Sequence, residues 1–147
     1  MKNKCTNKLA LTLPALSVNE GAARAMVSAF CAQLNPTIEE IADIKCSVSE
    51  AVTNCIVHAY PEKCGDIYIT VKLFDTRTVK IEIKDKGCGI DDTELVKTPL
   101  YTTDQSGERS GMGFAVMESF MDKLVLKSKV GKFTKVTLVK TLAPIDI

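Results

Sequence analysis

Apolar and polar side chains alternate along several short stretches of the chain, the pattern of half-buried β-strands. The first stretch is Leu9–Leu13, within KLALTLP. The next two, DIYITVKLF and TVKIEIK, are separated by the tight segment Asp75-Thr76-Arg77. The last, KLVLKSKVGKFTKVTLVK, is typical of a hairpin that turns near Gly131. We therefore expect five strands.

Apolar residues at helical spacing predict three helices among these strands. Ser17 followed by Glu20 has the form of a capping box, which predicts that the first helix begins there. This helix runs to about Leu34. Asn35-Pro36 then ends it, because the residue before a proline avoids helical geometry.

A second capping box, Thr37 with Glu40, predicts a long helix that extends to about His58. Helical spacing returns from Met112 to Met121. The predicted order is strand, two helices, two strands, a loop, a helix and two strands. This order indicates a two-layer α/β (α+β) sandwich with helices on one face of the sheet. We expect a single domain over residues 1–147.

Composition excludes several classes of protein. Apolar residues make up 46% of the 147 residues, charged residues 25%, and the net charge is +1, which is ordinary for a globular protein. The basic residues are scattered along the sequence, so charge predicts no nucleic acid or other polyanion as a partner. No run approaches the ~18 apolar residues of a membrane span, and we expect no membrane partner.

The six cysteines stand at positions 5, 31, 46, 55, 64 and 88, without a Cys-x-x-Cys motif and with one histidine in the chain. This spacing argues against a zinc site. No disulfide framework is indicated either, so we expect reduced thiols and a cytoplasmic location.

The second helix carries a polar stripe. At about 100° per residue, Asn54 lies within about 40° of Glu50, and Asp43, Ser47 and His58 fall on the same side. The stripe has two interpretations: the solvated face of an amphipathic helix, or a carboxylate and a carboxamide that position magnesium and accept a proton. For His58, the sequence favours a helix-dipole contact over catalysis.

Two glycine-containing loops follow the strands. In DKGCGI, Gly87 and Gly89 permit close backbone approaches, and Asp85 at the strand end is placed to accept a hydrogen bond. A simple turn is the alternative. In SGERSGMGF, the amides of Gly111 and Gly113 precede a helix, where they suit a phosphate. This loop matches neither the Walker nor the Rossmann motif.

The order of these motifs is more specific than any of them alone. Glu-x-x-x-Asn on a helix, Asp-x-Gly-x-Gly after a strand, and Gly-x-Gly before a helix resemble the nucleotide-binding fold of gyrase, ninety-kilodalton heat-shock chaperones, histidine kinases and mismatch-repair ATPases. The resemblance implies a Bergerat-type fold with a mixed, mainly antiparallel sheet. It also implies that the loop SGERSGMGF wraps phosphates.

Longer strings narrow the resemblance. SEAVTNCIVHAY and PLYTTDQSGERSGMGFAVMESFMD are similar to the anti-sigma-F family of endospore-forming bacteria, which are serine kinases. That resemblance implies a homodimer that binds a sporulation sigma factor. It also implies that ATP and Mg²⁺ are used to phosphorylate a serine of an anti-anti-sigma protein.

The resemblance also implies roles for single residues. Glu50 would be the general base, Asn54 would coordinate Mg²⁺, and Asp85 would bind the adenine amine beside Gly87 and Gly89. The phosphates would be lined, under a lid of about residues 97–110, by Thr103, Arg109, Gly111, Met112 and Gly113.

Partner contacts are implied for Arg24 and Thr53. Two positions depart from wider relatives: the third motif is Gly-Met-Gly-Phe rather than Gly-x-Gly-Leu, and Glu50 replaces the asparagine of histidine kinases. A glutamate favours a proton acceptor. The remaining alternatives are an ATP hydrolase, a nucleotide-binding module that only sequesters a sigma factor, and a kinase of the general stress response.

Overall fold

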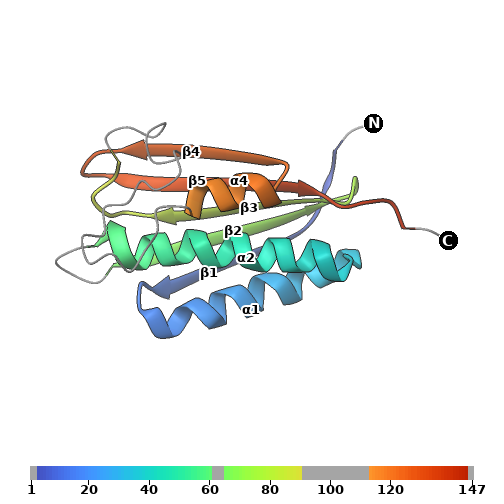
Figure 1. Ribbon diagram of the computed structural model, residues 1–147, viewed down its shortest axis with the longest axis horizontal. Coiled ribbons are helices and arrows are strands. Elements are labelled where there is room, and N and C mark those ends of the chain that lie inside the picture. Colours follow the sequence, from blue (N-terminus) through green and yellow to red (C-terminus); the bar gives the residue numbers. More distant parts are fainter. Residues whose placement is uncertain (1–2, 61–64, 91–112, 146–147) are drawn as a thin grey trace.

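The fold is a sheet covered on one face by helices, as expected (Figure 1). A computed structural model describes residues 3–60, 65–90 and 113–145 of the chain. The sheet order is β1-β2-β3-β5-β4, and all four ladders between described strands are antiparallel. The strands are β1 (Cys5–Pro14), β2 (Asp66–Phe74), β3 (Thr78–Asp85), β4 (Lys123–Lys129) and β5 (Phe133–Thr141).

Helices α1 (Glu20–Cys31), α2 (Ile38–Asn54) and α4 (Gly113–Phe120) lie on the same face of this sheet (Figure 1). Their apolar sides meet the inward residues of the strands, which alternate with outward ones as the sequence pattern predicts. Full burial of one such side chain contributes about 1.5–3 kcal/mol. The fully buried core includes Val27, Ile44, Val48, Val52, Ile67, Ile69, Val71, Leu73, Ile81, Met117 and Leu138.

The start of the first helix differs from the expected capping box. A 3-10 turn, Ser17–Asn19, precedes α1, and neither Ser17 nor Asn19 caps it with its side chain. The physical reason is that the Glu20 carboxylate has other partners: it pairs with Arg24 at 3.3 Å and accepts a hydrogen bond from the Ser49 hydroxyl of α2. A tertiary contact therefore replaces the local one.

The capping box of α2 is confirmed. The Thr37 hydroxyl accepts from the Glu40 N–H at 3.0 Å, and Glu40 Oε1 accepts from the Thr37 N–H at 2.9 Å. Glu40 Oε2 also accepts from the Ala143 N–H at 2.8 Å, which ties the end of β5 to this helix. The hydrogen bond from the Thr37 backbone is the main reason that the pKa of Glu40 is lowered.

Helix α2 changes its geometry near its carboxyl end. After Asn54 the chain continues as a π-helix over Cys55–Ala59, so the helical segment reaches the predicted neighbourhood of His58 by a wider turn. Such π-turns are rare and occur often at functional sites. This turn lies next to the loop that follows β3.

Among the described residues, no helix has both the length and the apolar character required to cross a membrane. Five cysteines are free thiols in the part of the chain that the structure covers. Burial raises the pKa of the Cys31 thiol to about 12, which makes it a poor nucleophile.

The two proposed caps lead to a direct test. We expect Thr37→Ala to lower the free energy of unfolding by about 1 kcal/mol, because an N-cap hydrogen bond is lost. Ser17→Ala is expected to leave it unchanged, because Ser17 makes no cap. Denaturant unfolding measured by circular dichroism compares them; equal losses in both variants would contradict the assignment.

Candidate functional site

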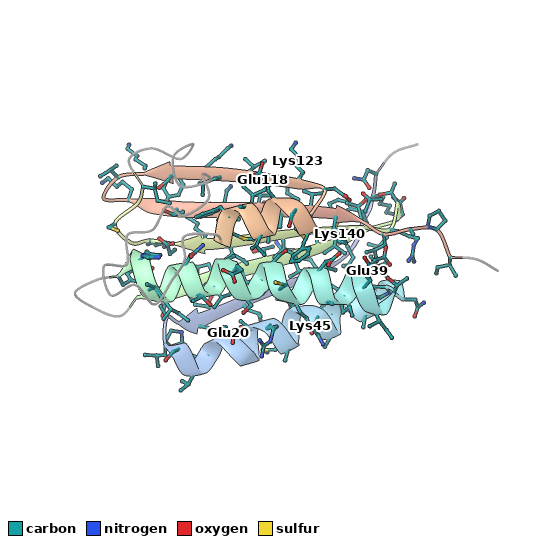
Figure 2. The ribbon with its side chains drawn as sticks, in the orientation of Figure 1. Glu20, Glu39, Lys45, Glu118, Lys123 and Lys140 are labelled. Atoms are coloured by element: carbon teal, nitrogen blue, oxygen red, sulfur yellow. The ribbon has the colours of Figure 1, made fainter. Side chains whose placement is uncertain are left out.

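Lys140 holds α4 alongside α2. Its ammonium lies 3.4 Å from Asp43 Oδ2 of α2 and donates to the Phe120 carbonyl at the end of α4, at 2.8 Å (Figure 2). The two helices lie side by side and run in opposite directions (Figure 1). Glu50 is seven positions beyond Asp43, and Gly113 is seven before Phe120, about 10 Å of helix in each case. The first residue of α4 is therefore roughly level with Glu50.

The polar stripe of α2 is partly withdrawn from solvent. Ser47 is fully buried, while Glu50 and Asn54 are half-buried. Asp43 is used in the structural ion pair with Lys140. The burial argues against the solvated-face interpretation, because a solvated face would leave these side chains exposed.

Two buried polar atoms on the stripe, Asn54 Nδ2 and Ser47 Oγ, have no hydrogen-bond partner among the described residues. An unpaired buried polar group costs about 1–3 kcal/mol. Native proteins keep such groups mainly where a ligand, an ion or a water completes them. The amide of Asn54 is therefore a candidate ligand-binding group.

The described part of the chain contains no group of three or more His, Cys, Asp and Glu side chains that could hold a metal ion. Mg²⁺ does not need such a group, because it keeps several waters and takes one or two protein oxygens together with substrate phosphates. The Asn54 carbonyl oxygen, one turn from the Glu50 carboxylate, fits this requirement.

Asp85 is a buried carboxylate at the end of β3, with an exposed fraction of 4%. Its Oδ1 accepts from the Gly87 N–H at 2.9 Å. Burial raises the pKa of Asp85, and burial next to this carboxylate raises the pKa of Cys55 well above its usual value. Such an acceptor suits a polar ligand group that enters the same site.

Gly87 makes the closest approach in this loop. A Cβ at this position would stand 2.1 Å from the Ala59 carbonyl oxygen, which is far inside contact distance. The same carbonyl accepts from the Cys88 N–H at 2.9 Å. The loop is therefore docked on the end of the π-helix, and no side chain fits between them.

Gly89 is required for a second reason. Its φ is +74°, and a Cβ would stand 2.4 Å from the Lys129 carbonyl oxygen. The Gly131 N–H donates to the Cys88 carbonyl at 2.7 Å, which fastens the loop to the β4–β5 hairpin. The expected close approaches are thus present, and the protein's own backbone is what crowds both glycines.

Tyr60 is a site residue that the sequence analysis missed. Its hydroxyl donates to the Asp66 carbonyl at 2.7 Å and accepts from the Lys86 N–H at 2.8 Å. It joins the end of α2, the start of β2 and the loop after β3. The sequence gives no sign of this role beyond a tyrosine at a helix end.

The third motif lies mostly outside the described residues. Thr103, Arg109, Gly111 and Met112 fall there, as does the proposed lid over residues 97–110. Gly113 is described and is the first residue of α4. The expected helix after the motif is confirmed.

Arg24 and Thr53 lie on one connected surface of α1 and α2. Arg24 pairs with Glu20, and Glu20 accepts from the Ser49 hydroxyl. The Thr53 hydroxyl donates to the Ser49 carbonyl at 2.6 Å. These contacts link the two residues within the chain, and their role in partner contact stays a prediction.

Comparisons with known proteins identify the family of this chain. Residues 13–140 match the family described as Histidine kinase-like ATPase domain. "Anti-sigma F factor" of Caldanaerobacter subterraneus subsp. tengcongensis is 52% identical over 91% of this chain and 93% of its own length. The Clostridium acetobutylicum protein of the same name is 48% identical over 95% and 97%, and that of Bacillus subtilis is 48% identical over 93% and 94%.

Solved structures share the fold. The RsbU and RsbW domains of Rv1364c from Mycobacterium tuberculosis match with a TM-score of 0.69 at 22% identity, over 93% of this chain and 33% of that one. The mycobacterial sensor histidine kinase MprB matches with a TM-score of 0.58 at 14% identity, over 93% and 100%. From its sequence, its fold and these relatives, the chain belongs to the histidine kinase-like ATPase domain family and, within it, to the anti-sigma F factors.

Proposed function

We propose that this protein binds and inhibits the sporulation sigma factor sigma F, and that it uses Mg-ATP to phosphorylate a serine of an anti-anti-sigma protein. The observation that carries the kinase half is the half-buried pair on α2, Glu50 and Asn54, roughly level with the start of α4. The names of the relatives support the anti-sigma half.

In this proposal, Glu50 is the general base that takes the proton of the substrate serine. A carboxylate serves this purpose at neutral pH, and its half-buried position keeps much of the water away. Asn54 would hold hydrated magnesium through its amide oxygen. The magnesium ion, when bound with ATP, neutralises phosphate charge.

The amino end of α4 supplies the complementary charge. The N–H groups of its first turn have no acceptor within the helix, and together with the helix dipole they favour a phosphate near Gly113. We assign Thr103, Arg109, Gly111 and Met112 to the same phosphate-binding loop. In this assignment, Arg109 stabilises the negative charge of the phosphates.

Asp85 is assigned to the adenine amine. Its buried carboxylate already accepts from the Gly87 N–H, which orients it before a ligand arrives. Gly87 and Gly89 shape the loop that covers the base. Preorganisation of this kind lowers the entropy cost of binding.

The surface formed by Arg24 and Thr53 is assigned to partner contact, and we expect the protein to act as a homodimer in the cytoplasm, where a sigma factor works. Arg24 is exposed, and its ion pair with Glu20 is the ordinary surface kind that contributes about 0–1 kcal/mol. Such a pair exchanges readily for a partner carboxylate.

The base assignment is tested by phosphate transfer. We expect Glu50→Gln to reduce the rate of transfer of labelled γ-phosphate from Mg-ATP to the anti-anti-sigma protein by about 10²–10⁴-fold, while ATP affinity stays near that of the wild type. Glu39→Gln is the matched control, because Glu39 is exposed in the first turn of α2 (Figure 2).

A Glu50→Gln protein that transfers phosphate at the wild-type rate would contradict the assignment. A wild type that binds ATP and transfers nothing would leave a module that only sequesters the sigma factor.

The adenine assignment is tested by Asp85→Asn. Loss of a hydrogen bond to a charged group costs about 1.5–3 kcal/mol, so we expect ATP affinity to fall by about tenfold or more. Titration calorimetry measures this, with Asp66→Asn, exposed at the start of β2, as the control.

The same variant has a predicted effect on stability. Burial raises the folded-state pKa of Asp85 above its unfolded value, so the carboxylate's cost to folding appears as the pH rises through that pKa. At pH 7 Asp85→Asn removes this cost, so we expect a melting temperature at least as high as that of the wild type.

In the calorimetric test, an ATP affinity of Asp85→Asn equal to that of the wild type would contradict the adenine assignment.

A further inference from the structure

A row of polar side chains lies on the inward face of the sheet, at the end where the loop after β3 begins. Asp85 shares this face with Ile83, two positions earlier on β3, which belongs to the core. In the strand registers, Asp85 is opposite Thr134 of β5, and Thr134 is opposite Ser128 of β4. Side chains of opposite residues stand about 4.5–5.5 Å apart on the same face. The carboxylate assigned to adenine thus has two hydroxyl groups in line with it across the sheet.

The Ser128 hydroxyl makes three contacts. It accepts from the Ile90 N–H at 2.7 Å, and it donates to the Phe133 carbonyl at 2.8 Å. Its oxygen lies 2.9 Å from the Thr134 hydroxyl oxygen. Ile90 is the last residue of the DKGCGI segment, so Ser128 fastens the far end of the proposed adenine loop to β4.

The number of protons decides which of the two hydroxyls is the donor, because the geometry of their contact allows either. A hydroxyl has one proton and two lone pairs. A carbonyl only accepts, so the Ser128 proton points to the Phe133 oxygen, since two acceptors at 2.8 Å would repel each other. One lone pair of Ser128 takes the Ile90 N–H, and the other takes the proton of Thr134. Thr134 is therefore the donor.

This arrangement fixes the chemical character of Thr134. Its single proton is used by Ser128, so toward any other group the Thr134 oxygen is an acceptor. The neighbouring Asp85, when ionised, is also an acceptor, and it is 4% exposed. Away from bulk water, a polar ligand group without a matching partner is costly. Two adjacent acceptors therefore discriminate between ligands that donate and ligands that accept.

We propose that Ser128 is a positioning residue that makes the nucleotide site selective for a base with an exocyclic amine. It acts by holding the Thr134 oxygen as an acceptor beside the Asp85 carboxylate, and it does not touch the nucleotide itself. The inference rests on the proposed function, in which Asp85 binds the adenine amine. That amine has two N–H groups, one for each acceptor. Guanine and hypoxanthine carry a keto oxygen at the same position, which finds no donor there.

Removal of the Ser128 hydroxyl has two separable consequences. The Ile90 N–H and the Phe133 carbonyl lose their partner, which loosens the loop and weakens the binding of every nucleotide alike. The Thr134 hydroxyl is also released, so that it is free to turn and to donate its proton to a keto oxygen. The first consequence lowers affinity, whereas the second changes the ratio of affinities for two bases.

The test measures this ratio by titration calorimetry of the full-length protein with Mg-ATP and with Mg-ITP, whose hypoxanthine has the keto oxygen. We expect the wild type to prefer ATP by about tenfold or more. Ser128→Ala is expected to narrow the ratio of ATP to ITP affinity by about fivefold, the effect of one neutral hydrogen bond. Ser128→Thr keeps a hydroxyl at this position and is expected to restore the wild-type ratio.

Thr134→Val separates selectivity from the fastening of the loop. Valine has nearly the shape of threonine, and Ser128 keeps its contacts with Ile90 and Phe133 in this variant. ATP loses one acceptor, so we expect the ratio to narrow by about fivefold, with ITP affinity within about twofold of the wild type. Far-ultraviolet circular dichroism establishes that each variant is folded. If Ser128→Ala does not fold, Thr134→Val and Ser128→Thr decide the question.

Ser28→Ala is the matched control. Ser28 is a buried serine of α1 whose hydroxyl donates to the Ala25 carbonyl at 3.1 Å, so the same group is removed from a similar environment. It belongs to no part of the proposed nucleotide site. The ratio of ATP to ITP affinity is expected to equal that of the wild type.

Two results would overturn the inference, and they differ in what they leave standing. If the wild type prefers ATP but Ser128→Ala and Thr134→Val keep its ratio, Ser128 only fastens the loop, and the assignment of Asp85 to adenine stands. If the wild type binds ATP and ITP equally, the inference fails together with that assignment.

Discussion

The contact between Gly87 and the Ala59 carbonyl is the constraint on which the site depends. It joins two segments that the chain keeps far apart, the end of the α2 helical segment and the loop after β3, at a distance that excludes a side chain. The same carbonyl, at the last residue of the π-helix, accepts a hydrogen bond from the Cys88 N–H. Burial of that carbonyl without a partner would be unfavourable.

This docking fixes the positions of the other groups. The Asp85 carboxylate accepts from the Gly87 N–H, and the loop is fastened on its other side to the β4–β5 hairpin through Gly131. Glu50 lies nearer the amino end of the same helical segment. Helix α4 lies alongside α2, held there by the contacts of Lys140 with Asp43 and the Phe120 carbonyl. One helical segment thus carries the residues assigned to the base and the metal, and its end holds the loop assigned to adenine.

Local signals were predictable from the sequence, and tertiary ones were not. The capping box of Thr37 joins residues three apart, so its sequence pattern was sufficient to predict it. The capping box predicted at Ser17 does not form, because the Glu20 carboxylate contacts Arg24 on its own helix and Ser49 on α2. The glycines of DKGCGI were recognised, but the atoms that require them, on Ala59 and Lys129, appear only after folding.

ATP affinity of Gly87→Ala is the most direct measurement of this account, with Gly21→Ala as the control because its Cβ would meet only Arg24 Nη2 at an ordinary 3.9 Å. The account predicts that Gly87→Ala keeps the far-ultraviolet circular dichroism of the fold and loses ATP affinity by about tenfold or more, since the added methyl forces the loop off the Ala59 carbonyl. A Gly87→Ala protein that is folded and binds ATP as tightly as Gly21→Ala would contradict it.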